Sequence, residues 1–317
     1  MALKSGMAAQ LGVKAETTWG TFVAPTRFYP LISESLTEEI DRLESEGIIA
    51  GQRVLRSEQW AAGNVDVGGD IQTELYQQGM GALLKACFGA VATTGAGPYT
   101  HTFTPGDLTD DHLSVQVGKP DTAGTVQPFS FYGMKVTDWE LSIEAGGLVK
   151  LTTSLVGKQL ATSDSLATAS YGTGAATPFT FKHATASVAG GAANVKKLTI
   201  KGSNGLDGDR RFIGSEYRAE PLEADLREYG GTVDLEFESL TQYNRFRNAN
   251  EVALVSTISA GASASLTPPM TVRFDGATPE VDGRGIVQLS APYKCIGTTT
   301  DAPAITAVLI SNDTTPV

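Results

Sequence analysis

The chain contains the stretch GGDIQTEL at residues 68–75 and the related stretch GGTVDLEF at residues 230–237. In both stretches a pair of glycines precedes a run in which apolar and polar residues alternate, and Glu74 aligns with Glu236. Such alternation is typical of a β-strand that buries one of its two faces. The two stretches therefore predict the same kind of strand at two places in the chain.

Further matching blocks occur in the same order around these stretches. A segment with apolar residues at helical spacing follows each of them, roughly Met80–Phe88 and Thr241–Asn248. The other matches are Asp41-Arg42 with Asp209-Arg210 upstream, and GLVKL at 147–151 with GIVQL at 285–289 downstream. Independent use of Gly-Gly turns and alternating strands is the alternative, but the shared order favours an internal duplication.

The composition favours many short strands over helices. The 317 residues include 35 glycines, and 41% of them are hydrophobic. Alternating or β-rich runs predict further strands at residues 113–117, 139–143, 149–156 and 195–200. We expect a mostly β protein with antiparallel sandwich or barrel sheets, each flanked by a short α-helix.

The matching blocks predict a division into five parts. A first half at residues 31–160 and a second half at 178–296 would be joined by a linker at 161–177, which is rich in Ala, Ser, Thr and Gly. Residues 1–30 would form an N-terminal arm, and residues 297–317 a C-terminal arm or strand.

The charge and hydropathy patterns argue against several classes of protein. The formal net charge is −11, the reverse of the basic surface that holds nucleic acid through its phosphates. No apolar run approaches the roughly 18 residues of a membrane span, and the N-terminus lacks the apolar segment of a signal peptide. With only two cysteines, Cys87 and Cys295, we expect no disulfide framework, which fits assembly in a reducing cytoplasm.

No pattern in the sequence indicates catalysis or a bound metal. Gly157-Lys158 lacks the spacing of a phosphate-binding loop, and no Gly-x-Ser-x-Gly motif is present. The three histidines, His101, His112 and His183, are scattered without metal-ligand spacing. Carboxylates are numerous, but no spacing singles out a catalytic pair. We therefore expect neither an enzyme nor a cofactor.

Two long polar segments, residues 36–63 and 203–229, occupy corresponding places in the two halves. Long ordered loops in compact domains usually have a function, so we expect contact surfaces; solvated, partly mobile excursions are the alternative. The charged residues expected to make these contacts are Glu38, Asp41, Arg42, Arg53, Arg56, Asp209, Arg210, Glu220 and Arg227.

Short motifs spread along most of the chain point to one family. They are ETTWGT at 16–21, PTRF at 25–28, RSEQW at 56–60, GGDI at 68–71, YTHTF at 99–103, GKPD at 118–121, EFESL at 236–240 and YNRFR at 243–247. Together they resemble the phage tail tube protein family of long, non-contractile phage tails and prophages, over roughly residues 10–295. None of the motifs is catalytic. The resemblance implies a structural virion protein with a duplicated tail-tube fold, assembled in the host cytoplasm.

The resemblance also implies rings that stack around a lumen through which DNA passes during ejection. Acidic side chains on the lumen surface would repel phosphates within roughly 8 Å at physiological salt, so that DNA slides without specific binding. The residues expected to face the lumen are Asp66, Asp70, Gln72, Glu74, Asp234, Glu236 and Glu238. The alternative is that they form the outer faces of ordinary amphipathic strands.

Two tube folds in one chain would change the expected ring from six subunits to three. We expect a homotrimeric ring with pseudo-six-fold symmetry, with a homohexamer as the alternative. The expected partners are further copies of the chain and other tail proteins, namely a tape measure, a terminator and a distal tail protein, with no membrane. The alternative functions are a β-sandwich that binds glycans or a host surface, and a tube-end protein of the same fold, a terminator or baseplate hub.

Overall fold

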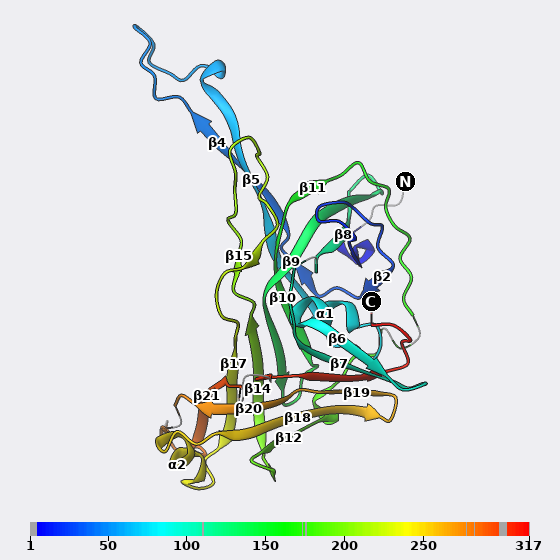
Figure 1. Ribbon diagram of the computed structural model, residues 1–317, viewed down its shortest axis with the longest axis vertical. Helices are drawn as coiled ribbons and strands as arrows, with labels where there is room; N and C mark the ends of the chain where they lie inside the picture. Colours follow the sequence, from blue (N-terminus) through cyan, green and yellow to red (C-terminus); the bar gives the residue numbers. More distant parts are fainter. Residues whose placement is uncertain are drawn as a thin grey trace.

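The protein is elongated and consists almost entirely of antiparallel strands (Figure 1). The computed structural model describes residues 5–109, 111–172, 174, 176–276, 278–281, 283–297 and 303–316. Strands make up 51% and helices 8%, which confirms the mostly β class. The helices α1 (Gly81–Phe88) and α2 (Thr241–Arg247) lie where the sequence predicts them. Parts of the expected linker (residues 173 and 175) and of the expected C-terminal segment (298–302 and 317) lie outside the described residues.

One continuous antiparallel sheet runs through the molecule. In order of pairing its strands are β4 (Thr37–Glu44), β5 (Trp60–Glu74), β10 (Lys150–Gly157), β9 (Val126–Glu144), β14 (Val195–Ser203), β17 (Glu228–Glu236), β21 (Gln288–Cys295) and β20 (Pro269–Phe274). The other side of β20, from Pro269 to Val272, pairs with β18 (Val252–Gly261). The short β3 (Ser33–Glu34) precedes β4 along the same edge of β5. Because β9 pairs with β14, the sheet crosses from the first expected half into the second without a break.

Two further groups of strands extend this framework and enclose the core. The first consists of β1 (Gln10–Ala15), β2 (Arg27–Tyr29), β8 (Leu113–Pro120) and β11 (Gln159–Ala161), together with the N-terminal part of β9. The second consists of β6 (Gly89–Thr94), β7 (Tyr99–Pro105), β22 (Ala307–Ser311), β19 (Ala264–Thr267), β18 (Val252–Gly261), β12 (Ala184–Val188) and β13 (Gly191–Ala192). The remaining elements are β15 (Leu206–Asp207), β16 (Leu222–Glu223) and the 3₁₀ turns η1 (Gly6–Ala8), η2 (Ser57–Gln59) and η3 (Phe181–His183).

The core is densest around α1. Its apolar residues, Leu83, Leu84 and Cys87 among them, are buried, as their helical spacing predicts. The ring of Phe88 lies 5.1 Å from that of Trp139 on β9, between centroids, which ties the helix to the long sheet. In contrast, α2 has no fully buried residue and lies at the opposite end of the molecule from β4 (Figure 1).

The two expected halves have the same strand registers. In β5 and β10, Gly68 lies opposite Val156 and Glu74 opposite Lys150; in β17 and β21, Gly230 lies opposite Lys294 and Glu236 opposite Gln288. The second set is the first set shifted by a constant number of residues on each strand. The glycine pairs also allow the same close approach, because a β carbon on Gly69 would lie 2.3 Å from the carbonyl oxygen of Ser35, and one on Gly231 would lie 1.9 Å from that of Thr199.

Both terminal segments contribute strands to these sheets. Strand β1, within the expected N-terminal arm, pairs with β8 and buries Leu11 and Val13 completely. Strand β22, within the expected C-terminal segment, lies between β7 and β19 and so joins the two halves a second time. The expected linker is irregular, and the side chain of Gln116 binds the backbone of Ser165 and Ala167 within it.

Candidate functional site

The long sheet packs one face on the core and leaves the other face open to solvent. Asp70, Gln72 and Glu74 of β5 alternate with buried residues and lie on the open side, as do Asp234 and Glu236 of β17. Strands β10, β9 and β14 lie between β5 and β17 in a continuous pairing, so both sets share one surface. The sheet thus brings together acidic positions that the sequence predicts in separate halves.

We call this surface the open face. It consists of Asp70, Gln72, Glu74, Lys150, Thr152, Ser154, Asp138, Glu140, Ser142, Glu144, Lys197, Thr199, Lys201, Glu228, Thr232, Asp234, Glu236, Gln288, Ser290 and Lys294. Carboxylates outnumber lysines on it. The Nζ atom of Lys201 lies 2.8 Å from Oε2 of Glu140, and that of Lys294 lies 3.7 Å from Oε1 of Glu228. The open face is therefore of mixed charge with an acidic excess.

Sequence reasoning did not select the carboxylates of β9, although the alternation over residues 139–143 marks them. Nor did it select the lysines of the open face, because which strands become neighbours cannot be read from either strand alone. Across β9 and β14, Glu144 lies opposite Lys197 and Glu140 opposite Lys201, so opposite charges meet on adjacent strands.

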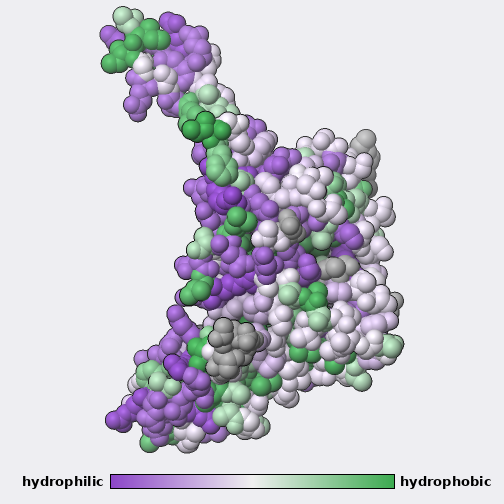
Figure 2. Space-filling view, in the orientation of Figure 1, coloured by the Kyte–Doolittle hydropathy of each residue, from purple (hydrophilic) through white to green (hydrophobic). Residues whose placement is uncertain are grey.

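The open face is hollowed near its middle. A depression of about 740 Å³ is lined by residues of β9, β10, β14, β17 and β21, including Glu140, Lys201 and Glu228. In Figure 2 the left-hand outline is indented between the upper projection and the foot that carries α2, and the surface there is mainly hydrophilic. The hollow is wide and open, and several charged side chains reach it, unlike an enclosed site for a small ligand.

Two further residues predicted to face the lumen are engaged by side chains from outside the long sheet. Asp66 continues the alternation of β5 and is 45% exposed, but Arg211 and Arg218 of the 203–229 segment both donate hydrogen bonds to its carboxylate. Glu238 lies beyond the end of β17 and accepts a hydrogen bond of 3.1 Å from the side chain of Asn194.

The polar segment 36–63 is mostly a β-hairpin, where a loop was predicted. Strand β4 pairs with the first part of β5, from Thr37 opposite Gly68 to Glu44 opposite Trp60. This hairpin and its tip at residues 45–59, together called the arm, project from the top of the molecule in Figure 1. Its exposed apolar side chains are Ile40, Leu43, Ile48, Ile49, Val54, Leu55 and Trp60. Figure 2 shows such patches along the arm and at its tip.

The predicted contact residues of the arm occupy different levels of it. Glu38, at its base, accepts a hydrogen bond of 3.2 Å from the backbone of Leu160. Further out, Arg42 lies over the ring of Trp60, 5.8 Å from its centroid, and Asp41 is exposed. The other predicted residues, Arg53 and Arg56, are exposed at the tip, where Arg56 pairs with Glu58 at 3.3 Å.

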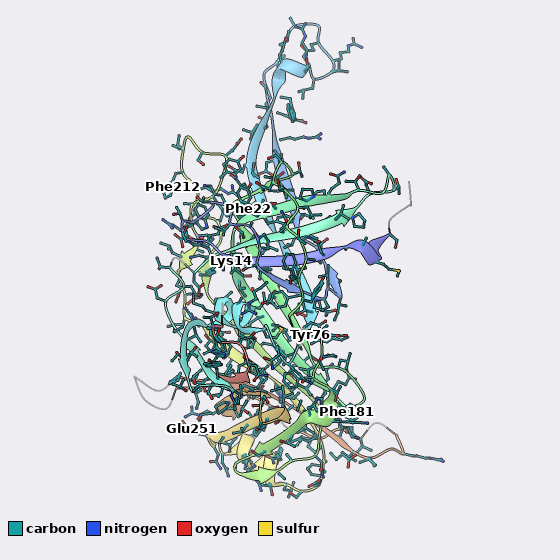
Figure 3. All side chains as sticks on the ribbon, turned by 90° about the vertical axis from the view of Figure 1, so that its right-hand side faces the viewer. Lys14, Phe22, Tyr76, Phe181, Phe212 and Glu251 are labelled. Carbon is teal, nitrogen blue, oxygen red and sulfur yellow. The ribbon has the colours of Figure 1, made fainter. Side chains whose placement is uncertain are left out.

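The second polar segment, 203–229, lies beside the base of the arm. The backbone nitrogen of Val65 donates to the carbonyl of Glu216 at 2.9 Å, which holds the two together. Phe212 is 62% exposed and Ile213 is fully exposed, and Figure 3 shows Phe212 at the margin of the molecule below the arm. The predicted residues Asp209 and Arg210 accompany this apolar pair: Asp209 binds Arg211 at 2.8 Å, and the Arg210 guanidinium lies over the Phe212 ring.

Glu220 and Arg227, also predicted to make contacts, instead fasten this segment to the body. Glu220 forms an ion pair with Lys135, whose side chain is 1% exposed. Arg227 donates hydrogen bonds to the carbonyl groups of Phe88 and Gly106 and is 10% exposed. Both side chains are engaged within the chain.

The described residues contain no group of three or more His, Cys, Asp or Glu side chains that could hold a metal ion. Cys87 lies in α1 and Cys295 at the end of β21, and burial raises the pKa of Cys295 to about 12. In the same part of the chain, no helix is long and apolar enough to cross a membrane.

Comparison with family models shows which family the chain belongs to. The model described as phage tail tube protein matches residues 6–295. The chain belongs to the phage tail tube protein family. Comparison with curated proteins found no match. As a phage tail tube protein, it is a structural, non-enzymatic component of the virion tail, which assembles with itself and with other tail proteins. This confirms the family and the non-enzymatic role predicted from the sequence.

Proposed function

We propose that this protein forms rings that stack into the tail tube, with the open face lining the lumen through which DNA is ejected. The observation that carries the proposal is that carboxylates of both halves lie on one continuous, solvent-exposed sheet. An acidic excess repels phosphates at short range, and two of the four lysines of the open face, Lys201 and Lys294, are paired with carboxylates. DNA would therefore pass along this face without binding to it.

The chain holds two copies of one tube unit in this proposal, and three chains complete a pseudo-six-fold ring. The shared registers of β5–β10 and β17–β21 support two copies, as does the helix that follows β5 and β17. The expected halves at 31–160 and 178–296 then mark the two units, although β1 and β22 lie outside these bounds and pack with them.

Stacking of rings is assigned to the arm and to the exposed part of the 203–229 segment. The arm carries apolar side chains that nothing in the chain covers, such as Ile48 at 99% exposure, and Ile213 is exposed beside its base. A head-to-tail contact of this kind cannot close on itself and continues along an axis, which produces a tube. The ends of the tube would meet other tail proteins: the tape measure, the terminator and the distal tail protein.

Electron microscopy and native mass spectrometry of the purified protein test this proposal. We expect hollow tubes of stacked rings, and rings whose mass corresponds to three copies of the 33.2 kDa chain. Rings of six chains would overturn the trimer. A monomer that binds glycans or cell envelopes and never polymerises would overturn the tube itself, and a single ring per tail would indicate a tube-end protein.

A further inference from the structure

Within the chain, the junction between the two halves is a strand pairing. Strands β9 and β14 are antiparallel, with Glu140 opposite Lys201. Backbone hydrogen bonds flank the pairing at both ends, from Ala145 to Lys196 at 2.9 Å and from Asn204 to Thr137 at 2.8 Å. Since such bonds occur at every second residue of an antiparallel pair, Glu140 and Lys201 form a non-hydrogen-bonded pair, in which the side chains are closest.

The first half has a counterpart of β14 whose outer edge is free. Strands β3 and β4 pair with β5 in the register in which β14 pairs with β17. Ser33 lies opposite Gln72 and Thr37 opposite Gly68. At the corresponding positions of the second half, Lys197 lies opposite Asp234 and Lys201 opposite Gly230. Among the described residues, no strand pairs with the other edge of β3 and β4. Ser35, Thr37 and Glu39 are exposed there, whereas Thr199, the counterpart of Ser35, is 8% exposed.

The second half has a counterpart of β9 that is left incomplete. Phe274 of β20 lies opposite Tyr293 of β21, and these two residues correspond to Val136 of β9 and Leu155 of β10, which also lie opposite each other. The bridge between Glu280 and Gln288 corresponds in the same way to the pairing of Ser142 with Lys150. Yet β20 ends at Phe274, and the described residues from 275 to 281 form no regular strand. Val281 is 77% exposed, whereas its counterpart Ile143 is 8% exposed beside β14. Strand β14 pairs with β9 in the first half, but among the described residues no strand pairs with this segment in the same way.

We infer that the segment at residues 278–281 of one copy pairs with the β3–β4 edge of the next copy, in the register that β9 and β14 have within the chain. This register places Thr278 opposite Thr37 and Glu280 opposite Ser35 of the neighbour. The occupant is a second copy of this chain, because one chain carries both halves of the contact and each half matches a pairing already made inside it. The inference rests on the proposed ring, and it assigns the surface that closes it.

Pro279 sets the strength of this contact. It corresponds to Leu141, a residue that β14 pairs with in the internal junction, and it has no backbone N–H to donate. The contact between copies therefore makes fewer hydrogen bonds than the β9–β14 pairing. A proline on an edge strand also hinders indiscriminate pairing, which keeps the free segment from aggregating before a ring forms.

Disulfide trapping tests the register. Non-hydrogen-bonded pairs have Cα atoms about 4.5 Å apart, within the range of a disulfide. The double variant Thr278→Cys with Thr37→Cys should become covalently linked between copies when assembled rings are oxidised, giving a closed trimer on non-reducing gels. The matched control, Thr278→Cys with Glu39→Cys, displaces one thiol by two residues, about 6.6 Å along the strand, and should link at least tenfold less. Each single variant should remain uncrosslinked.

The outcomes separate this inference from the proposed function. Tubes that form normally but link equally well through Glu39→Cys, or through neither pair, would refute the register and leave the tube intact. A protein that never forms rings would remove both. Hydrogen exchange gives a second readout: the amides of Thr278, Glu280 and Val281 should exchange quickly in the monomer and be protected in rings, and unchanged exchange in rings would contradict the pairing.

Discussion

At the residue scale, Gly69 is required by a close approach of two backbones. Its φ is +138°, and a β carbon there would lie 2.3 Å from the carbonyl oxygen of Ser35. We expect Gly69→Ala to lower the free energy of unfolding by about 1–3 kcal/mol, through backbone strain and displacement of β3 from β5. Urea denaturation measures this change. Gly285→Ala is the control, since nothing lies within 4 Å of its β carbon, and an equal loss there would contradict the argument.

Lys135 is a buried charge whose partners hold the 203–229 segment. Its ammonium donates to the carbonyl groups of Leu108 at 2.7 Å and Pro221 at 3.1 Å and pairs with Glu220. We expect Lys135→Met to cost about 3 kcal/mol in urea unfolding, because a carboxylate and two carbonyl groups lose their partner. The control is Lys201→Met, whose exposed ion pair with Glu140 should contribute less than about 1 kcal/mol. Equal losses of unfolding free energy in the two variants would show that burial does not strengthen the contacts of Lys135.

Residue patterns predicted the strands with one buried face, and the reason is local. In β5, Asp70, Gln72 and Glu74 alternate with buried residues, so their orientation follows from the sequence alone. Asp66 continues this alternation, but two arginines from a segment about 150 residues away donate hydrogen bonds to its carboxylate. No local pattern contains that contact, and the same holds for the role of Arg227 as an anchor.

At the element scale, the two helices were predictable and the arm was not. Strand β4 reads TEEIDRLE, and nearly all of its residues are exposed on both faces, so it lacks the period of two that marks a half-buried strand. Its only strand partner among the described residues is β5. The pairing of β9 with β14 could not be predicted either, because regular alternation predicts a strand but does not indicate which other strand it pairs with.

The arm gives a prediction at this scale. Because the backbone nitrogen of Ser45 donates to the carbonyl of Gln59 at 2.8 Å, this pair can close a two-residue Asn-Gly turn that replaces residues 46–58 and preserves the hairpin register. We expect the shortened protein to form soluble rings of normal mass but no long tubes, since the exposed Ile48, Val54 and Leu55 are lost. Electron microscopy measures tube length, and native mass spectrometry checks the ring. Tubes of normal length would show that the tip of the arm does not connect rings.

At the scale of the whole molecule, two pairings of regular strands tie the two halves together, in addition to the contacts of the 203–229 segment with the first half. Strand β9 pairs with β14, and β22 lies between β7 and β19. A family match and an internal repeat indicate two units, but they do not indicate that the units share a sheet. The shared sheet places acidic side chains of both halves on one surface. The charge of that surface therefore depends on both halves of the folded chain.

The charge of the open face can be tested in assembled tubes. The quadruple variant Asp70→Asn, Glu74→Gln, Asp234→Asn and Glu236→Gln removes carboxylates from exposed or half-buried positions of the open face and leaves Lys150, Lys197, Lys201 and Lys294 in place. We expect normal tubes, because the new amide oxygens can accept the hydrogen bonds that Glu74 and Asp234 accept, but measurable retention of short double-stranded DNA in a sedimentation assay at low salt. The retention should weaken as salt is raised, since released counterions drive binding to phosphates.

A matched variant separates the lumen from the rest of the surface. Asp107→Asn, Asp121→Asn, Asp225→Asn and Glu251→Gln remove the same charge from exposed or half-buried sites outside the open face, and Figure 3 marks Glu251 among them. If the open face lines the lumen and its acidic excess lets DNA slide, only the first variant should retain DNA. Equal retention by both would mean that total charge, rather than the open face, keeps the tube from binding DNA, and retention by neither would place the lumen on another surface.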